Sequence, residues 1–171
     1  CLAGGVALNC VANGKLIKEG IFEQVFVQPA AGDAGGALGA ALAGEYIYYA
    51  NEREAISSDA MKGSLLGPYF SKKEVERMNR KWGAQATYID DFGELCEKAA
   101  GLLADGKILG WFQGRMEYGP RALGNRSILA DPGRQDMQQK LNLSIKYRES
   151  FRPFAPSVLK EDASQYFELE G

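Results

Sequence analysis

Histidine is absent from the 171 residues of this sequence. Its absence excludes Ser-His-Asp and Cys-His nucleophilic sites, and any metal site that these residues would build with imidazole ligands. Cysteine is scarce as well, because Cys1, Cys10 and Cys96 are an odd number and have no Cys-x-x-Cys spacing. This usage predicts a protein of the reducing cytoplasm rather than a secreted protein held by disulfides.

The sequence also lacks a long apolar run and a leader in which positive charge precedes apolar residues. We therefore expect neither a membrane-spanning segment nor export. Net positive charge is concentrated in one segment. Residues 107–160 contain ten Lys and Arg against four Asp and Glu, a local charge of +6, which leaves −8 for the rest of the chain. A basic segment in an acidic chain predicts an anionic ligand rather than a nucleic acid, because nucleic-acid binders are usually basic overall.

The first fifty residues alternate between short apolar segments and segments with helical spacing. They predict strands over 1–9 and 21–29, and helices over 10–20 and 30–50, the last one opened by Gly32 and Asp33. This strand–helix–strand–helix order predicts an α/β fold with a parallel sheet.

The second half is expected to mix helices and strands in an α+β arrangement, after a polar linker over residues 51–66. Helices are predicted over 71–83, 92–106, 134–150 and 160–169. Strands are predicted over 107–114 and 126–132, with a bent or edge strand over 151–159 because Pro153 and Pro156 interrupt it.

Two glycine-rich turns let the backbone approach a ligand closely. The free N–H groups and the dipole at the start of helix 30–50 favour a phosphate. Neither turn is a Walker A or Rossmann fingerprint. Asp33 has two interpretations, a helix N-cap or a carboxylate that binds a metal or a phosphate-linked group. The candidate nucleotide-binding residues of the two turns are Gly4, Gly5, Asn9, Gly35 and Gly36.

The segment GRMEYGPRALGNRSILADP, residues 114–132, places three arginines among three glycines and a proline before Asp131. Glycine and proline shape turns, and arginine grips planar anions with two parallel hydrogen bonds. The alternative is a surface turn with solvated charges.

Four segments, in this order, resemble the NodU/CmcH-type O-carbamoyltransferases: LAGGVALNC, GDAGGALGAAL, GWFQGRMEYGPRALGNRSILADP and FRPFAPSVL. The resemblance implies that residues 1–50 are the end of an actin-like ATPase-fold domain, similar to that of the threonylcarbamoyl-tRNA transferases. It implies that residues 67–171 are the first part of a YrdC-like domain.

The resemblance also implies a two-step reaction, of the kind used in natural-product or nodulation-factor biosynthesis. The YrdC-like part joins carbamoyl phosphate to ATP, with its Mg²⁺, and gives carbamoyl-adenylate and pyrophosphate. The actin-like part then moves the carbamoyl group to a hydroxyl of a small acceptor molecule. An iron-type metal is held there by histidines and an aspartate, for which Asp33 is the matching residue.

This sequence departs from the family pattern in having no histidine and in stopping at Gly171. We therefore interpret it as a piece of a longer chain, inactive on its own. Interrupted sheets leave unpaired edges, which favour pairing with a second copy as a homodimer.

Within the resemblance, the arginines acquire a chemical role. They neutralise the phosphates of carbamoyl phosphate and ATP and stabilise charge on the leaving pyrophosphate. The catalytic candidates are Arg115, Arg121 and Arg126; the substrate-binding candidates are Arg148, Arg152, Asn125 and Ser127, the last two orienting a carbamoyl amide or a phosphate oxygen.

Two alternatives stay open. One is a non-catalytic module of YrdC-like type that binds a nucleotide or RNA with the same arginines. RNA recognition normally adds exposed aromatics, whereas Trp111, Phe112, Phe151 and Phe154 lie in strand-like runs and are expected in the core. The other is a phosphotransferase of the sugar-kinase type, which leaves the arginine segment unexplained.

Overall fold

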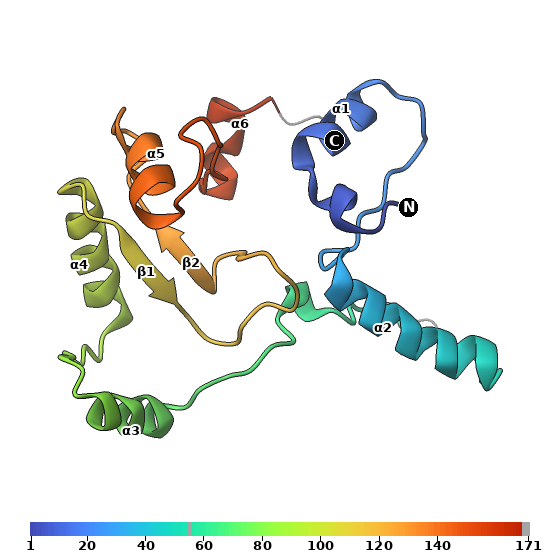
Figure 1. Cartoon of the computed structure of the whole chain (residues 1–171), viewed down its shortest axis with the longest axis horizontal. Helices are drawn as coiled ribbons and strands as arrows, with labels where there is room; N and C mark the ends of the chain where they lie inside the picture. Colours follow the sequence, from blue (N-terminus) through green and yellow to red (C-terminus); the bar gives the residue numbers. More distant parts are fainter. Residues whose placement is uncertain (55, 169–171) are drawn as a thin grey trace. The chain divides into compact units, whose positions relative to one another are not determined.

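The computed structural model describes residues 1–54 and 56–168, in two compact units (Figure 1). The first unit contains residues 1–87 and 110–127, and the second contains residues 88–109 and the described residues from 128 onward. The first unit therefore contains both the glycine-rich turns and the segment with Arg115, Arg121 and Arg126. The domain boundaries predicted at residues 50 and 66 stay predictions.

The helices predicted in the first fifty residues are confirmed. A 3₁₀ turn at Gly5–Leu8 leads into α1, Cys10–Lys18, whose first turn is capped by the Asn9 side chain accepting from the Ala12 N–H at 3.1 Å. Helix α2, Asp33–Ala43, continues as a π-helical turn at Gly44–Tyr48.

The two strands predicted in the same region are wrong in extent. Their pairing is one parallel bridge between Leu2 and Val27, beside a hydrogen bond of 2.8 Å from the Leu2 N–H to the Phe26 carbonyl. The parallel direction agrees with the prediction, but the described residues add no third strand to this pair. Parallel sheets are stable when further strands and helices cover them, so a lone pair stays a single bridge.

The middle of the chain depends on local capping. After a 3₁₀ turn at Lys62–Ser64, α3 spans Lys72–Trp82. Ser71 and Glu74 form a reciprocal capping box at its start, and Gly83, with a φ of 61°, ends it in the left-handed conformation. The helix predicted over 71–83 is confirmed.

The second unit contains three helices among its described residues. Helix α4, Phe92–Ala104, is capped by the Asp91 carboxylate accepting from the Glu94 N–H at 2.8 Å, as predicted over 92–106. Helix α5 spans only Met137–Lys140 and continues as a π-helical turn at Leu141–Ile145.

Helix α6, Ala163–Tyr166, follows a 3₁₀ turn at Lys160–Asp162 within the predicted range 160–169, of which Leu169 lies outside the described residues. The strand predicted over 151–159 is wrong. These residues have no strand pairing, because Pro153 and Pro156 remove two backbone donors from a nine-residue segment.

Strands β1, Leu109–Phe112, and β2, Arg126–Leu129, form an antiparallel two-stranded sheet and confirm the strands predicted there within shorter bounds (Figure 1). The chain thus combines helices and a small sheet, in agreement with the mixed α/β prediction. The expectation that Phe112, Phe151 and Phe154 are core residues is wrong, because they are 52%, 76% and 36% exposed. A two-stranded sheet cannot cover both of its faces.

Two further findings concern the helices and the thiols. Among the described residues, none of the helices combines the length and the apolar character that crossing a bilayer requires. Cys1, Cys10 and Cys96 are exposed free thiols.

Small residues determine how the first unit packs. Ala7, Ala30 and Ala31 are its buried apolar residues, and α2 begins directly after the last two. A side chain at Gly35 would overlap the Ala30 carbonyl oxygen, whereas a side chain at Gly36 would meet nothing within 4 Å. The start of α2 therefore tolerates a methyl group on one flank only.

This asymmetry predicts opposite effects of two neighbouring substitutions. Gly36→Ala is expected to stabilise α2 by up to about 1 kcal/mol, because alanine is the better helix former. Gly35→Ala is expected to destabilise the protein, because the new methyl group must displace the Ala30 backbone. Thermal unfolding of both variants in the full-length protein measures the difference, and equal midpoints would contradict this packing.

Candidate functional site

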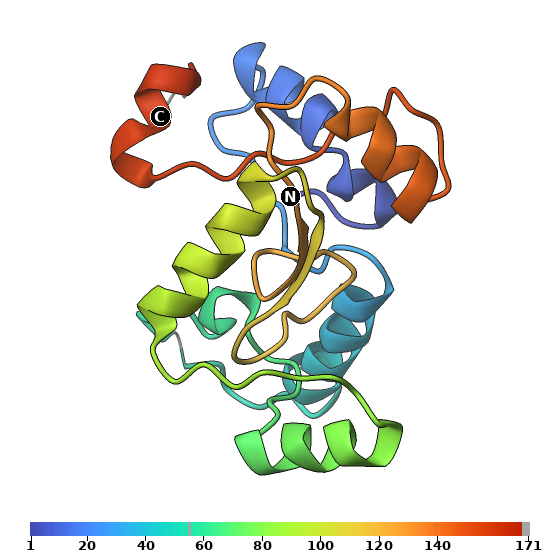
Figure 2. The same ribbon diagram turned by 90° about the vertical axis from the view of Figure 1, so that its left-hand side faces the viewer.

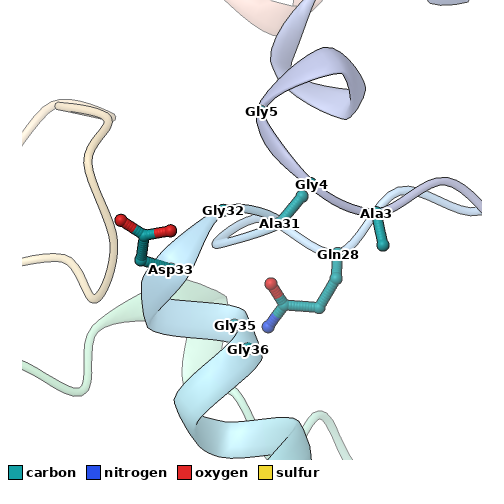
Figure 3. A pocket seen from close by; sticks show the side chains of 9 residues that line it. All are labelled: Ala3, Gly4, Gly5, Gln28, Ala31, Gly32, Asp33, Gly35 and Gly36. Carbon is teal, nitrogen blue, oxygen red and sulfur yellow. The ribbon is translucent and has the colours of Figure 1, made fainter.

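The two glycine-rich turns meet at a pocket of about 340 Å³ at the start of α2 (Figure 3). Four of the predicted nucleotide-binding residues line it, Gly4, Gly5, Gly35 and Gly36. Asn9 does not line it, since its side chain caps α1. The complete lining is Ala3, Gly4, Gly5, Gln28, Ala31, Gly32, Asp33, Gly35 and Gly36.

Backbone and amide hydrogen bonds hold the walls of this pocket. The Gly4 N–H donates to the Ala31 carbonyl at 2.7 Å and joins the two turns. The Gln28 side chain accepts from the Ala30 N–H and lies 3.7 Å from the Met61 sulfur. With seven glycine and alanine residues in its lining, the pocket offers backbone groups and the positive end of α2 rather than reactive side chains.

Asp33 is the first residue of α2 and is exposed. Its interpretation as an N-cap is wrong, because Gly32 occupies that position and no side chain caps the helix. Figure 3 shows the Asp33 carboxylate and the Gln28 side chain on opposite sides of the first turn. The described residues contain no group of three or more Cys, Asp or Glu that could hold a metal. These residues do not form a metal site by themselves, and the role of Asp33 as a metal ligand stays a prediction.

The segment between β1 and β2, residues 113–125, is here named the arginine loop. It reaches the start of α2 in Figures 1 and 2, where the Tyr118 hydroxyl donates to the Ala34 carbonyl. The Tyr118 N–H donates to the Ser64 carbonyl at 2.6 Å. Gly119 has a φ of 102°, and a Cβ there would lie 2.7 Å from the Ala30 Cβ. The loop therefore contacts Ala30 and Ala34, which are direct neighbours in the chain of residues that line the glycine pocket.

The arginine loop is built around the carboxylate of Glu117, whose side chain is completely buried. Its Oε1 accepts from the N–H groups of Leu123 at 2.7 Å and Asn125 at 2.8 Å. Its Oε2 pairs with Arg126 Nε at 3.2 Å. Glu117 was not among the site residues predicted from the sequence, although it is an acidic residue within the basic arginine segment.

Opposing effects act on the pKa of Glu117. Burial raises it, because the charged form loses water. The hydrogen bonds from the Leu123 and Asn125 backbone and from the Arg126 guanidinium lower it, and together they outweigh burial. The pKa of Glu117 therefore lies below the usual range of a glutamate.

The three arginines of the predicted catalytic set have different surroundings. Arg126, half-buried, donates from Nη2 to the carbonyls of Gly119 at 2.7 Å and Arg121 at 3.2 Å, in addition to its pair with Glu117. Arg115 donates to the Gly67 carbonyl at 2.7 Å. Over residues 1–54 and 56–168, neither a hydrogen bond nor an ion pair engages the exposed guanidinium of Arg121. Arg121 is thus available to bind an anion.

Two polar residues predicted to bind substrate also shape the loop. The Asn125 side chain donates to the Arg115 carbonyl at 2.8 Å, and the Ser127 hydroxyl accepts from the Gly124 N–H at 3.1 Å. Both contacts hold the backbone on either side of Arg121. Their predicted contact with substrate stays a prediction.

Arg148 and Arg152 belong to the second unit, and their sharing of a site with the arginine loop stays a prediction. Arg148 Nε donates to the Asn142 side chain at 2.7 Å, and its guanidinium lies 4.9 Å from the centre of the Phe154 ring. Arg152 pairs with Glu149 at 2.8 Å. Asn142 is fully buried, so it fixes Arg148 from the inside of this unit.

Two family profiles match this chain. Residues 1–42 match the profile described as "Carbamoyltransferase N-terminus", and residues 100–171 match the one described as "Carbamoyltransferase C-terminus". The N-terminal match contains the glycine pocket up to α2, and the C-terminal match contains the arginine loop and the arginines of the second unit.

Curated proteins are similar over nearly the whole chain. An uncharacterised protein of Synechocystis sp. is 58% identical over 99% of this chain and 28% of its own length. Nodulation protein NolNO of Sinorhizobium fredii is 50% identical over 98% of this chain and 24% of its own length. The 3'-hydroxymethylcephem-O-carbamoyltransferase of Streptomyces clavuligerus is 34% identical over 97% and 29%. The chain spans less than a third of the length of each of these relatives.

The lowered pKa of Glu117 predicts an acid-sensitive loop. A carboxylate with a lowered pKa in the folded state contributes stability above its unfolded pKa, about 4.3, and this contribution is lost as the pH falls through the folded pKa. Glu117→Gln removes the titrating group, so the thermal midpoint of the full-length variant should fall less than that of wild type between about pH 7 and about pH 3. Glu76→Gln, an exposed change on α3, should leave the wild-type pH dependence intact. Parallel curves for wild type and Glu117→Gln would exclude this role.

Proposed function

Because this chain belongs to the carbamoyltransferase family, we propose that it is part of an O-carbamoyltransferase that moves a carbamoyl group to a hydroxyl of a small molecule. One observation carries the proposal. The free guanidinium of Arg121 and the glycine pocket belong to one compact unit, in which the arginine loop packs against the start of α2. A cationic arm and a pocket lined by backbone groups suit a ligand with several phosphate charges.

The proposed reaction has two steps. In the first, water hydrolyses carbamoyl phosphate to carbamate and inorganic phosphate, and the carbamate oxygen attacks the α-phosphorus of ATP, which gives carbamoyl-adenylate and pyrophosphate. In the second, the acceptor hydroxyl attacks the carbamoyl carbon and AMP leaves. Phosphate chemistry of this kind depends on positioning and on neutralising charge. Arg121 supplies a positive charge that can stabilise the leaving pyrophosphate. Arg115 lies in the same loop, and its guanidinium donates a hydrogen bond to the Gly67 carbonyl.

A divalent metal and ATP with Mg²⁺ are the proposed cofactors. The metal, of the iron type, would polarise the carbamoyl group or the acceptor hydroxyl. Asp33 is its proposed ligand from this chain, and histidine ligands must come from outside residues 1–171. We therefore propose that these residues alone are inactive. The actin-like ATPase and YrdC-like assignments of the two halves belong to the same proposal.

One observation favours a second candidate, a module that binds a nucleotide or RNA without catalysis. Phe112, Phe151 and Phe154 are exposed within or beside the basic segment, and exposed aromatics next to arginines suit base stacking. The two candidates differ in chemistry. The enzyme forms pyrophosphate from ATP only when carbamoyl phosphate is present, whereas the module does not.

The first prediction of the proposal concerns Arg121. Arg121→Lys keeps the charge but loses the planar fork, so it should impair a bidentate phosphate contact. Loss of one charge-assisted hydrogen bond weakens binding by roughly ten- to a hundredfold. The measurement is carbamoyl-phosphate-dependent ATP–pyrophosphate exchange by the full-length protein at varied ATP concentration.

The matched control is Arg80→Ala, an exposed arginine in the last turn of α3 within the same unit. It should exchange as wild type does. If Arg121→Lys matches Arg80→Ala, the free guanidinium has no part in the reaction. If wild type exchanges no pyrophosphate and the chain retains RNA instead, the second candidate replaces the first.

A separate prediction concerns Asp33. Asp33→Asn keeps the shape of the side chain but removes the charge that a metal prefers. The full-length variant should lose bound metal, measured by elemental analysis, and should lose carbamoyl transfer while ATP–pyrophosphate exchange persists. Glu23→Gln, an exposed change in the same unit, is the control. Normal metal content in Asp33→Asn would remove Asp33 from the proposed ligand set.

A further inference from the structure

We propose that Glu117 is the positioning residue of the arginine loop, and that Arg126 is its partner in this role rather than a ligand-binding residue. Together they fix the loop so that Arg121 presents its guanidinium to the phosphate groups. This inference rests on the proposed function for the identity of the ligand, but the arrangement of the loop is independent of it.

Hydrogen bonds to the Glu117 carboxylate join the middle of the arginine loop to its C-terminal end. One carboxylate oxygen binds the N–H groups of Leu123 and Asn125, which lie six and eight residues further along the chain. The other oxygen binds Arg126 at the first position of β2. A completely buried side chain at position 117 thus holds the far end of the loop at three points.

Arg126 extends the same network to the near side of Arg121. Its Nη2 donates to the carbonyls of Gly119 and Arg121, so the backbone on both sides of Pro120 is tied to one guanidinium. Arg126 is therefore committed to contacts inside the loop. The carbonyl of Arg121 is held, while its own guanidinium is left for a ligand.

The cost of burying a carboxylate supports a functional reason for this network. A buried charge is expensive even when it is paired, and an apolar replacement of similar volume is often no less stable. A carboxylate here accepts from three donors at defined directions, which an apolar side chain cannot do. A site that binds phosphate through few side chains needs its loop to be held in place, because a small displacement of the Arg121 side chain would lose the contact with the phosphate.

The loop is also seated on a rigid support. The Tyr118 hydroxyl donates to the Ala34 carbonyl, and Gly119 packs against Ala30 at the start of α2. These contacts belong to the two residues that directly follow Glu117. The carboxylate therefore fixes the loop relative to the same structure that lines the glycine pocket.

The test is a double-mutant cycle in the full-length protein. Glu117→Gln retains one oxygen for the Leu123 and Asn125 N–H groups but puts an amide N–H₂ against Arg126. We expect kcat/KM for carbamoyl-phosphate-dependent exchange to fall at least about tenfold in Glu117→Gln and in Arg121→Ala, each alone. In the Arg121→Ala background, Glu117→Gln should cause no further loss beyond about twofold, because it acts through that arginine.

The control for this cycle is an exposed glutamate in the same unit. Glu76→Gln, on the exposed surface of α3, should change neither kcat nor KM. Losses that multiply in the double variant overturn the proposal, because they mean that Glu117 acts apart from Arg121. Glu117→Gln kinetics equal to wild type overturn it as well.

Hydrogen exchange tests the positioning role without any activity. The amides of Leu123 and Asn125 should exchange faster in Glu117→Ala and in Arg126→Lys than in wild type. The amides of α2 and α3 should exchange at the same rates in the variants and in wild type. Unchanged protection of residues 119–125 in both variants overturns the proposal. If wild type shows no pyrophosphate exchange but these amides respond as expected, the proposed function fails and the positioning role stands.

Discussion

The carboxylate of Glu117 and the three donors that surround it are the constraint on which the arginine loop depends. The loop contains three glycines, so its backbone has little intrinsic preference for one shape. A single buried acceptor selects that shape by collecting N–H groups from residues 123 and 125 and the guanidinium of Arg126. The contacts of Asn125 with the Arg115 carbonyl and of Ser127 with the Gly124 N–H lie in the same closed loop.

The second unit solves a related problem with a neutral side chain. The fully buried Asn142 accepts from Arg148 and also donates to the carbonyls of Ser150 and Arg152. A carboxylate could not do this, because an ionised carboxylate only accepts, whereas an amide both accepts and donates. Where the surrounding groups are all donors, as around Glu117, the carboxylate is the better choice.

The elements that the sequence predicted well are those determined by neighbours in the chain. The ends of α3 and α4 are determined by residues that act within one helical turn, so both helices can be predicted from the sequence. These residues are Ser71 with Glu74, Gly83 and Asp91. The strands of the first fifty residues were not, because a strand requires partners that the described residues do not supply.

The candidate site shows the same division. The two glycine turns could be recognised from the sequence, because each lies directly before or at the start of a helix. Their meeting was not predicted, since it depends on the hydrogen bond from the Gly4 N–H to the Ala31 carbonyl. The difference between Arg115, Arg121 and Arg126 was not, because it depends on which carbonyl groups the closed loop brings to each guanidinium. Glu117 was missed for the same reason, since its partners lie six to nine residues away along a loop rather than at a helical or strand spacing.

The glycine content of helix α2 has a thermodynamic consequence. Three of its eleven residues are glycine, which lowers its intrinsic stability by roughly 3 kcal/mol relative to alanine. Such a helix forms because its first turn is held, so a ligand bound at that turn bears on the ordering of the whole helix as well as on the pocket.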